Sequence, residues 1–107
     1  MIKNGRPFSV DRSGNVDDAL ITERKPEEQK KVLQWIKENI YPRKTPHLLH
    51  TSYSLKHLLE RDTGIYLTNN EFKDAMMICG FEPANPDKLN WMFGISHKSP
   101  IFKRANN

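Results

Sequence analysis

Cysteine is nearly absent from this chain, and no long apolar run occurs in it. Cys79 is the single cysteine among 107 residues, so no disulfide can form within the chain. A bilayer-spanning helix needs about 20 consecutive apolar residues, and no segment approaches that length. The first residues also lack the apolar stretch of a secretory signal. These absences predict a cytoplasmic protein that has no membrane span and no membrane partner.

Motifs of catalysis are missing as well. The five glycines are isolated, so no Gly-rich loop is present to hold phosphates. No nucleophile elbow of the Gly-x-Ser-x-Gly type occurs. Carboxylates gather between residues 60 and 74, but Glu71 fits a helix cap and Asp74 shares a solvated helix face with Lys73. We therefore predict no catalytic residue, no cofactor, no small-molecule substrate and no enzyme activity.

A metal site is not expected either. A structural zinc site needs four nitrogen or sulfur ligands at characteristic spacings, and the chain has no cysteine pair. The candidate ligands are His47, His50 and His57, but His47 and His50 fall in or beside a predicted loop, and His97 is distant in the sequence. Cys79 lies in a helical apolar stripe, where a lone cysteine acts as a small core residue.

The charge balance is mildly basic. Lys and Arg number 17 against 13 Asp and Glu, which gives a net charge of +4. Such a balance is compatible with a nucleic-acid partner but does not require one. The length fits one domain with a modest core. We expect a flexible N-terminal arm over residues 1–24 with one docked turn near residues 16–21, a domain over residues 25–97, and a flexible basic tail over residues 98–107.

Two helices are predicted in the first half of the domain. One begins at Pro26, a residue suited to the first helical position, and continues to about Ile40 before Pro42 ends it. The second extends from Ser52 or Tyr53 to Arg61, with Gly64 able to adopt the left-handed conformation just beyond it.

The third helix has the clearest local signals. Residues 68–71 form a capping box, in which Thr68 and Glu71 satisfy each other's backbone N–H groups. Leu67 and Phe72 have the spacing of a hydrophobic staple. Gly80 is expected to end the helix in a Schellman motif, with Phe81 packing back.

A strand follows over residues 89–96, because Trp91, Phe93 and Ile95 alternate on one face. Residues near 81–83 or 65–67 are candidate partners, and the proline-rich loop near residue 42 is a candidate for a short extended piece. Together these elements predict an α+β fold: a three-helix, helix-turn-helix-like (winged-helix-like) core with a short β-hairpin.

One resemblance supports this order of elements. The run Tyr66-Leu67-Thr68-Asn69-Asn70-Glu71-Phe72-Lys73-Asp74-Ala75-Met76, closed by Gly80-Phe81, resembles the winged-helix segment at the end of phage and plasmid primase-helicases. It resembles more closely small uncharacterised proteins of phages and conjugative elements in Gram-positive bacteria. That second resemblance extends over residues 41–45, 51–57 and 89–91 and covers roughly residues 32–96. It implies a mobile-element origin and no activity.

DNA binding is the sharpest functional hypothesis, because the second helix of a helix-turn-helix enters the major groove by its N-terminal residues. The candidate base-reading and phosphate-contacting residues are Arg43, Lys44, Asn69, Asn70, Lys73, Lys98, Lys103 and Arg104. The hypothesis has one weakness. Residues 68–80 contain one basic residue, Lys73, and two acidic residues, Glu71 and Asp74, so the presumed reading helix is net acidic. A helix that enters a DNA groove normally carries positive charge.

The alternative is a protein–protein adaptor or an inhibitor of a host or phage enzyme, for example an anti-defence protein, on the same scaffold. The surroundings of Asn69 should discriminate between the two. Neighbours such as Arg43, Lys44 and Lys98 favour DNA, whereas a ring of Glu60, Asp62 and Asp74 favours a protein partner. The leading expectation is therefore a non-enzymatic binding module of a mobile genetic element, with DNA ahead of protein as its partner.

Overall fold

The structure, a computed structural model, describes residues 1–105 but not the side chains of residues 104 and 105, and it has an α+β fold. Its helices are α1 (Pro26–Asn39), α2 (Ser52–Thr63), α3 (Asn69–Ile78) and α4 (Pro100–Ala105), with a 3₁₀ turn η1 (Ile21–Glu23). Its strands are β1 (Ile2–Lys3), β2 (Arg6–Pro7), β3 (Ser9–Val10) and β4 (Val16–Asp17). No helix within the described residues is long and apolar enough to span a bilayer.

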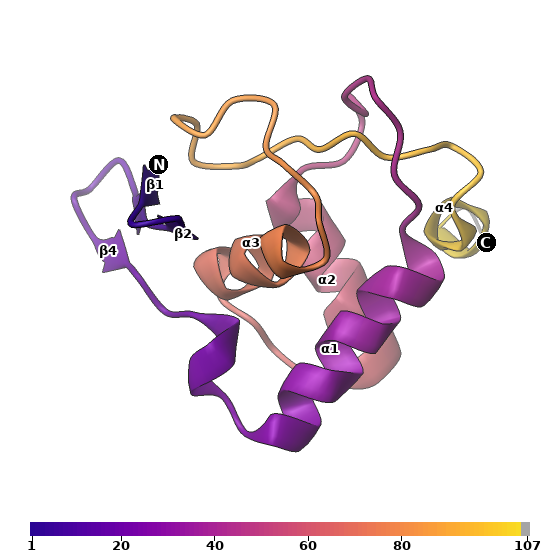
Figure 1. Cartoon of the computed structure of the whole chain (residues 1–107), viewed down its shortest axis with the longest axis horizontal. Coiled ribbons are helices and arrows are strands. Elements are labelled where there is room, and N and C mark those ends of the chain that lie inside the picture. Colours follow the sequence, from indigo (N-terminus) through magenta and orange to yellow (C-terminus); the bar gives the residue numbers. More distant parts are fainter. Residues whose placement is uncertain (106–107) are drawn as a thin grey trace.

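The helix α3 occupies the middle of the molecule (Figure 1). It packs against α1 and α2 and also against η1 and β2. Its residues Phe72, Ala75 and Met76 are completely buried, as the apolar stripe predicts. The rest of the core comes from α1, α2 and the segments around them, including Val32, Trp35, Ile36, Leu55, Leu59, Trp91, Phe93 and Ile95.

The predicted ends of α3 are confirmed. The Thr68 hydroxyl accepts from the Glu71 N–H at 3.2 Å, and the Glu71 carboxylate accepts from the Thr68 N–H at 2.9 Å. At the other end, the Phe81 N–H donates to the Met76 carbonyl and the Gly80 N–H donates to the Met77 carbonyl, both at 3.0 Å. These are the two hydrogen bonds of a Schellman motif.

The predicted helices before α3 are also confirmed. Pro26 is the first residue of α1, and Ile40 follows its last residue. The N-terminal residue of α2 is Ser52, preceded by Thr51, whose N–H donates to the Ser54 hydroxyl at 3.1 Å. Gly64 closes α2 with a φ of 75°, in the left-handed region.

The segment 91–96 is extended, but it is not part of a regular hairpin. It forms isolated bridges on both sides, between Ile95 and Pro42 and between Phe93 and Pro83. Residues near 83 are one of the two predicted partners, whereas the other, residues 65–67, forms no bridge with this segment within the described residues, and the loop near residue 42 was predicted only as an extended piece. The predicted short β-hairpin is absent from this part of the described chain. At the Pro42–Ile95 bridge the flanking residues make the hydrogen bonds, with the Arg43 N–H donating to Gly94 and the Ser96 N–H donating to Tyr41, so the missing N–H of Pro42 costs no bond of the pairing.

Gly94 allows the loop before α2 to approach this segment closely. The Arg43 N–H donates to the Gly94 carbonyl at 3.0 Å. A Cβ at residue 94 would lie 2.0 Å from the Arg43 carbonyl oxygen, so no larger residue fits without moving the backbone. The glycine therefore couples the loop at residues 41–47 to the buried strip of Trp91, Phe93 and Ile95.

The N-terminal arm, predicted to be flexible, is packed against the rest of the domain in this structure. β1 pairs with β2 and β3 pairs with β4, both antiparallel, and β2 packs on α3. The arm packs on α3 mainly through polar side chains and backbone groups. Because polar contacts need no apolar periodicity, the sequence pattern did not indicate them. Ile21 is its main apolar anchor and is completely buried.

The predicted tail also contains structure up to residue 105. Ser99, next to the start of α4, accepts a hydrogen bond from the Tyr41 N–H at 2.8 Å. Ile101 is completely buried, and the Phe102 ring stacks on His47 with centroids 4.5 Å apart. The apolar pair at residues 101 and 102 therefore docks α4 beside α1, whereas residues 106–107 lie outside the described residues.

Candidate functional site

Two of the three α3 residues predicted to read DNA, Asn70 and Lys73, are buried. The exposed fraction of Asn70 and of Lys73 is 0%. A base-reading side chain must reach into a groove, so neither can act in this conformation. The prediction that these two residues bind DNA is therefore corrected, because the N-terminal segment covers the face of α3 that was expected to be open.

Asn70 is held by four hydrogen bonds to that segment. Its amide nitrogen Nδ2 donates to the carbonyls of Pro7 and Ala19, both at 2.9 Å. Its Oδ1 accepts from the Ser9 hydroxyl at 2.8 Å, and its backbone N–H donates to Asp17 at 3.0 Å. A buried amide with these partners is a structural residue, since loss of any one would leave a buried polar atom unpaired.

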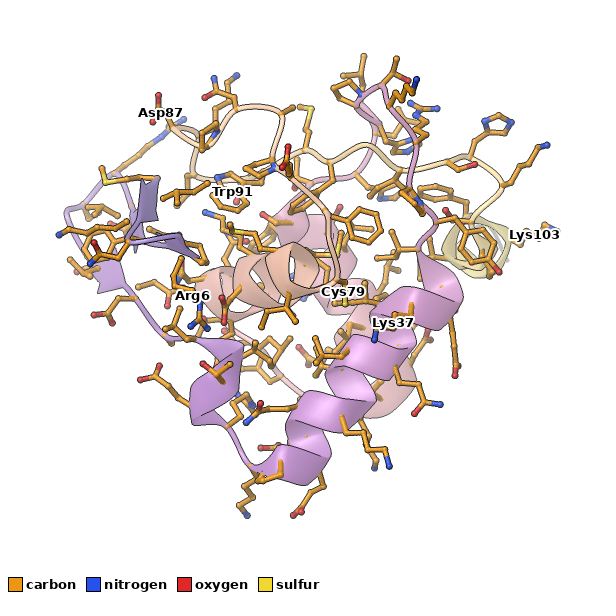
Figure 2. The ribbon with its side chains drawn as sticks, viewed as in Figure 1. Arg6, Lys37, Cys79, Asp87, Trp91 and Lys103 are labelled. Atoms are coloured by element: carbon orange, nitrogen blue, oxygen red, sulfur yellow. The ribbon has the colours of Figure 1, made fainter. Side chains whose placement is uncertain are left out.

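Lys73 lies in the same buried layer. Its Nζ donates to the Ser9 hydroxyl at 2.8 Å and lies 4.8 Å from the centre of the Trp91 ring, which sits over α3 (Figure 2). No carboxylate in the described part of the chain forms an ion pair with it. Burial lowers the pKa of Lys73 from 10.5 to about 8. A charged group buried with so few partners is unusual and is a candidate for function.

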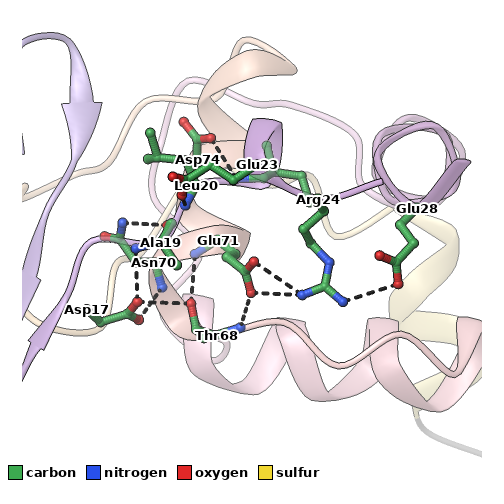
Figure 3. Close-up of polar contacts among 11 residues, drawn as sticks. Asp17, Ala19, Leu20, Glu23, Arg24, Glu28, Thr68, Asn70, Glu71 and Asp74 are labelled. Carbon is green, nitrogen blue, oxygen red and sulfur yellow. Dashed lines mark hydrogen bonds and ion pairs between the residues drawn. The ribbon is translucent and has the colours of Figure 1, made fainter. Parts of the chain in front are cut away.

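The acidic residues of α3 also pair with the N-terminal half of the chain (Figure 3). Arg24 donates to both carboxylate oxygens of Glu71 at 3.2 Å and to Glu28 at 3.2 Å. Arg6 donates to both oxygens of Asp74, at 2.7 and 2.6 Å. The interpretation of Asp74 as a solvated charge is therefore wrong, because its exposed fraction is 1%.

The remaining predicted cations lie apart from α3. The Arg43 guanidinium donates to the carbonyls of Thr45 and Pro46, both at 2.8 Å, so it holds its own loop. Lys44, Lys98 and Lys103 are exposed, and Lys103 points outward from α4 in Figure 2. Arg104 belongs to α4, but its side chain lies outside the described residues. The structure does not gather these cations around Asn69.

Asn69 is the predicted site residue that lines a cleft. The cleft has a volume of about 350 Å³ and lies between the β3–β4 hairpin, α2 and the loop after α3. Three of its apolar side chains are exposed: Val16 by 57%, Tyr53 by 51% and Leu89 by 38%. Sequence reasoning missed these three, because each comes from a different element and none belongs to an apolar stripe.

The polar groups of the cleft are acidic or amide. Asp11 and Asp17 are its carboxylates, so the acidic neighbours of Asn69 come from the N-terminal hairpin and not from helices. Backbone and side-chain hydrogen bonds from Asn15 lower the pKa of Asp11 and keep it charged. The Asn69 amide donates to Asn90 at 2.9 Å, while its buried Oδ1 has no partner in the described part of the chain.

The Tyr53 ring packs against a buried lysine, Lys56. The Lys56 ammonium lies 5.1 Å from the Tyr53 ring centre and 4.8 Å from that of Tyr66. Such contacts are attractive, and burial lowers the pKa of Lys56. Because Lys56 is 4% exposed, it supports the two tyrosines without presenting its charge on the surface.

The other candidate ligands and the cysteine form no metal site in the described part of the chain. Within residues 1–105, no three His, Cys, Asp or Glu side chains gather to hold a metal ion. Cys79 is partly buried against the core; burial raises the pKa of its thiol, which donates to the Leu33 carbonyl at 3.9 Å. In comparisons with known proteins, no family model, no curated protein and no solved structure matches the chain. The resemblance to phage and conjugative-element proteins therefore stays a prediction.

Proposed function

We propose that this protein is a non-enzymatic protein-binding module that acts in the cytoplasm. In this proposal the helix-turn-helix-like pair α2 and α3 is a scaffold, and the cleft beside Asn69 is the binding surface. The observation that carries the proposal is the cleft itself, in which Val16, Tyr53 and Leu89 are exposed around a volume of about 350 Å³. Exposed apolar side chains grouped at a concave surface are typical of interaction sites.

The charge of the cleft favours a protein partner over DNA. Asp11 and Asp17 repel phosphate, and Lys73, the one cation of α3, is buried. A protein segment that carries an apolar side chain beside Lys or Arg complements both the apolar walls and the carboxylates. Tyrosine is also among the residues that contribute most to protein interfaces, which makes Tyr53 the expected anchor.

The proposal also includes a winged-helix-like fold and an origin in a mobile genetic element. The short link between α2 and α3, residues 64–68, gives the two helices the connection of a helix-turn-helix. The winged-helix-like description and the origin in a mobile genetic element rest on the resemblance of residues 32–96 to phage and conjugative-element proteins. An adaptor or an inhibitor of a host or phage enzyme fits that origin.

The proposal is tested by capture of partners from a host lysate treated with nuclease. Tyr53→Ser removes the proposed anchor, whereas Tyr41→Ser removes a tyrosine that is 43% exposed outside the cleft. We expect one protein to be captured by the wild type and by Tyr41→Ser, and to be lost with Tyr53→Ser. Asp11→Asn should weaken its capture if the partner segment is basic.

Two results of this capture experiment would contradict the proposal. If capture disappears after nuclease treatment, or persists unchanged with both Tyr53→Ser and Asp11→Asn, the cleft is not the binding surface. Circular dichroism and melting curves of the variants show whether the fold is retained. Tyr53 and Asp11 are exposed, so their replacement should cost little stability.

A further inference from the structure

A ring cluster of His47, His50 and Phe102 joins α4 to the loop before α2. The His47 and His50 rings lie parallel, with centroids 5.6 Å apart. The Phe102 ring of α4 stacks on them, at 4.5 Å from His47 and 5.3 Å from His50. In Figure 1, α4 lies beside the end of α1, on the side of the molecule opposite β1 and β2. The ring cluster is therefore separate from the cleft beside Asn69, which other residues line.

His47 is buried in the ring cluster, where a charge on its ring is costly. The residue is 8% exposed, and its Nε2 is buried without a hydrogen-bond partner in the described part of the chain. A protonated imidazole carries an N–H on both ring nitrogens. Protonation would therefore leave a charged donor buried and unpaired, and burial disfavours a charged group much more than a neutral one. The packing of His47 fits the neutral ring.

The charged and titratable groups that act on His47 are all basic. They are His50 in the ring cluster, Arg43 in the loop before α2 and His97 in the segment before α4. The segment 91–96, to which the His47 N–H donates, has no charged side chain. Burial is the largest cause, and the three basic groups add to it, so the pKa of His47 is lowered from its ordinary value of 6.5.

The position of α4 depends on the contacts of its side chains, because a helix of six residues is too short to be stable without packing. Phe102 contacts the two histidines, and Ile101 is completely buried. The Ser99 hydroxyl, just before the helix, accepts from the Tyr41 N–H at 2.8 Å. Lys103 follows Phe102 in α4 and is exposed, so the charge that it brings to this side of the molecule is also positive.

We propose that protonation of His47 releases α4, so that the ring cluster is a pH-sensitive contact. With neutral histidines, Phe102 stacks on both rings and α4 is docked. With charged histidines, the two rings repel each other across 5.6 Å, and the buried Nε2 of His47 gains a partner only when water reaches it. The Phe102 ring attracts a cation, but the lowered pKa of His47 shows that burial and the basic neighbours outweigh this attraction. Departure of α4 uncovers both histidines to water.

Docking should weaken in acid, because the pKa of His47 is 6.5 in the released state and lower in the docked state. Below the higher value the released state binds more protons, so its share rises by up to roughly tenfold per pH unit until the lower pKa is passed. Hydrogen exchange of the Tyr41 amide measures this share, because its N–H is bonded to Ser99 beside α4. Its opening constant, corrected for the intrinsic exchange rate, is compared between about pH 7.5 and about pH 5. The Ile21 amide, bonded to Asp74, is the internal control and should keep its opening constant.

His47→Phe keeps an aromatic ring in the cluster but cannot titrate, so its Tyr41 opening constant should not rise in acid. His57→Phe, at an exposed histidine of α2, is the matched control and should behave as the wild type does. If His47→Phe does not fold, an NMR titration of the wild-type His47 ring still decides. It must give a pKa below 6.5, and the rise of the opening constant must level off near that pKa. An opening constant that stays level in the wild type, rises equally in His47→Phe, or rises in parallel at Ile21 would overturn the proposal.

Discussion

Arg6 in β2 and Asp74 in α3 form a two-point ion pair although 68 residues separate them in the sequence. The guanidinium donates from Nε at 2.7 Å and from a terminal nitrogen at 2.6 Å, and the same carboxylate accepts from the Ile21 N–H at 3.0 Å. The hydrogen bond to Asp74 raises the pKa of Arg6. This pair ties the N-terminal hairpins to the central helix.

Arg6→Gln should therefore destabilise the protein by about 1.5–3 kcal/mol, the range for a hydrogen bond to a charged group. The reason is that Asp74 stays buried without its cation. Urea unfolding of Arg6→Gln, Asp74→Asn and the double variant gives the coupling free energy. A coupling near zero would mean that the two residues do not interact in solution.

Docking of residues 1–24 should also protect backbone amides. The Ile21 N–H is bonded to Asp74 and the Asn70 N–H to Asp17, both inside the layer between the hairpins and α3. Hydrogen exchange at these two amides should be slow, close to the limit set by global unfolding, while the exposed Ser13 amide exchanges fast. Rapid exchange at Ile21 would show that the N-terminal segment is a loose arm after all.

The ends and core of α3 supply a third prediction. Thr68→Ala should cost on the order of 1 kcal/mol, because the cap of the Glu71 N–H is lost. Phe72→Ala should cost about 3–5 kcal/mol, because a completely buried ring leaves a cavity. Thermal or urea unfolding measures both. Near-equal curves for Phe72→Ala and the wild type are incompatible with this core.

Lys73 predicts an unusual dependence of stability on pH. Its pKa is about 8 in the folded protein and 10.5 in the unfolded chain. Between these two values the unfolded chain binds more protons, so the free energy of unfolding rises with pH, by about 3 kcal/mol over the whole interval. Unfolding of the wild type and Lys73→Met at about pH 7 and about pH 11 isolates this contribution, because the other titrating groups are common to both proteins. An identical pH dependence in the two would rule out a buried charged lysine.

Local rules explain which parts of the fold the sequence revealed. The capping box of Thr68 and Glu71, the Gly80 ending and the alternation of Trp91 and Phe93 each depend on residues a few positions apart. Pro83 belongs to a predicted pairing partner and Pro42 to a predicted extended piece, and each forms an isolated bridge in place of a regular hairpin.

Long-range polar contacts account for the features that the sequence did not indicate, above all the burial of Asn70 and Lys73. Asn70 and Lys73 were predicted to face solvent because they are polar and lie in the N-terminal part of the presumed reading helix. They are covered by Pro7, Ser9 and Ala19, more than 50 residues away, through hydrogen bonds. Such contacts have no periodic signature. Asn69 is the predicted α3 site residue that lines the cleft, but it was predicted to contact DNA and not a protein.

The central claim is that α3 is an internal helix and does not read DNA. A titration of labelled DNA at physiological salt, on a library of sequences, tests it most directly. The proteins compared are the wild type, Asn70→Ala and a triple variant in which Lys44, Lys98 and Lys103 are replaced by Glu. We predict weak binding without sequence preference, with Kd no tighter than the ~10⁻⁴–10⁻⁶ M typical of non-specific binding, abolished in the triple variant. Asn70→Ala, where it folds, should bind as the wild type does. A sequence preference in the wild type that Asn70→Ala relaxes at one base would contradict the account, because a buried amide cannot contact a base.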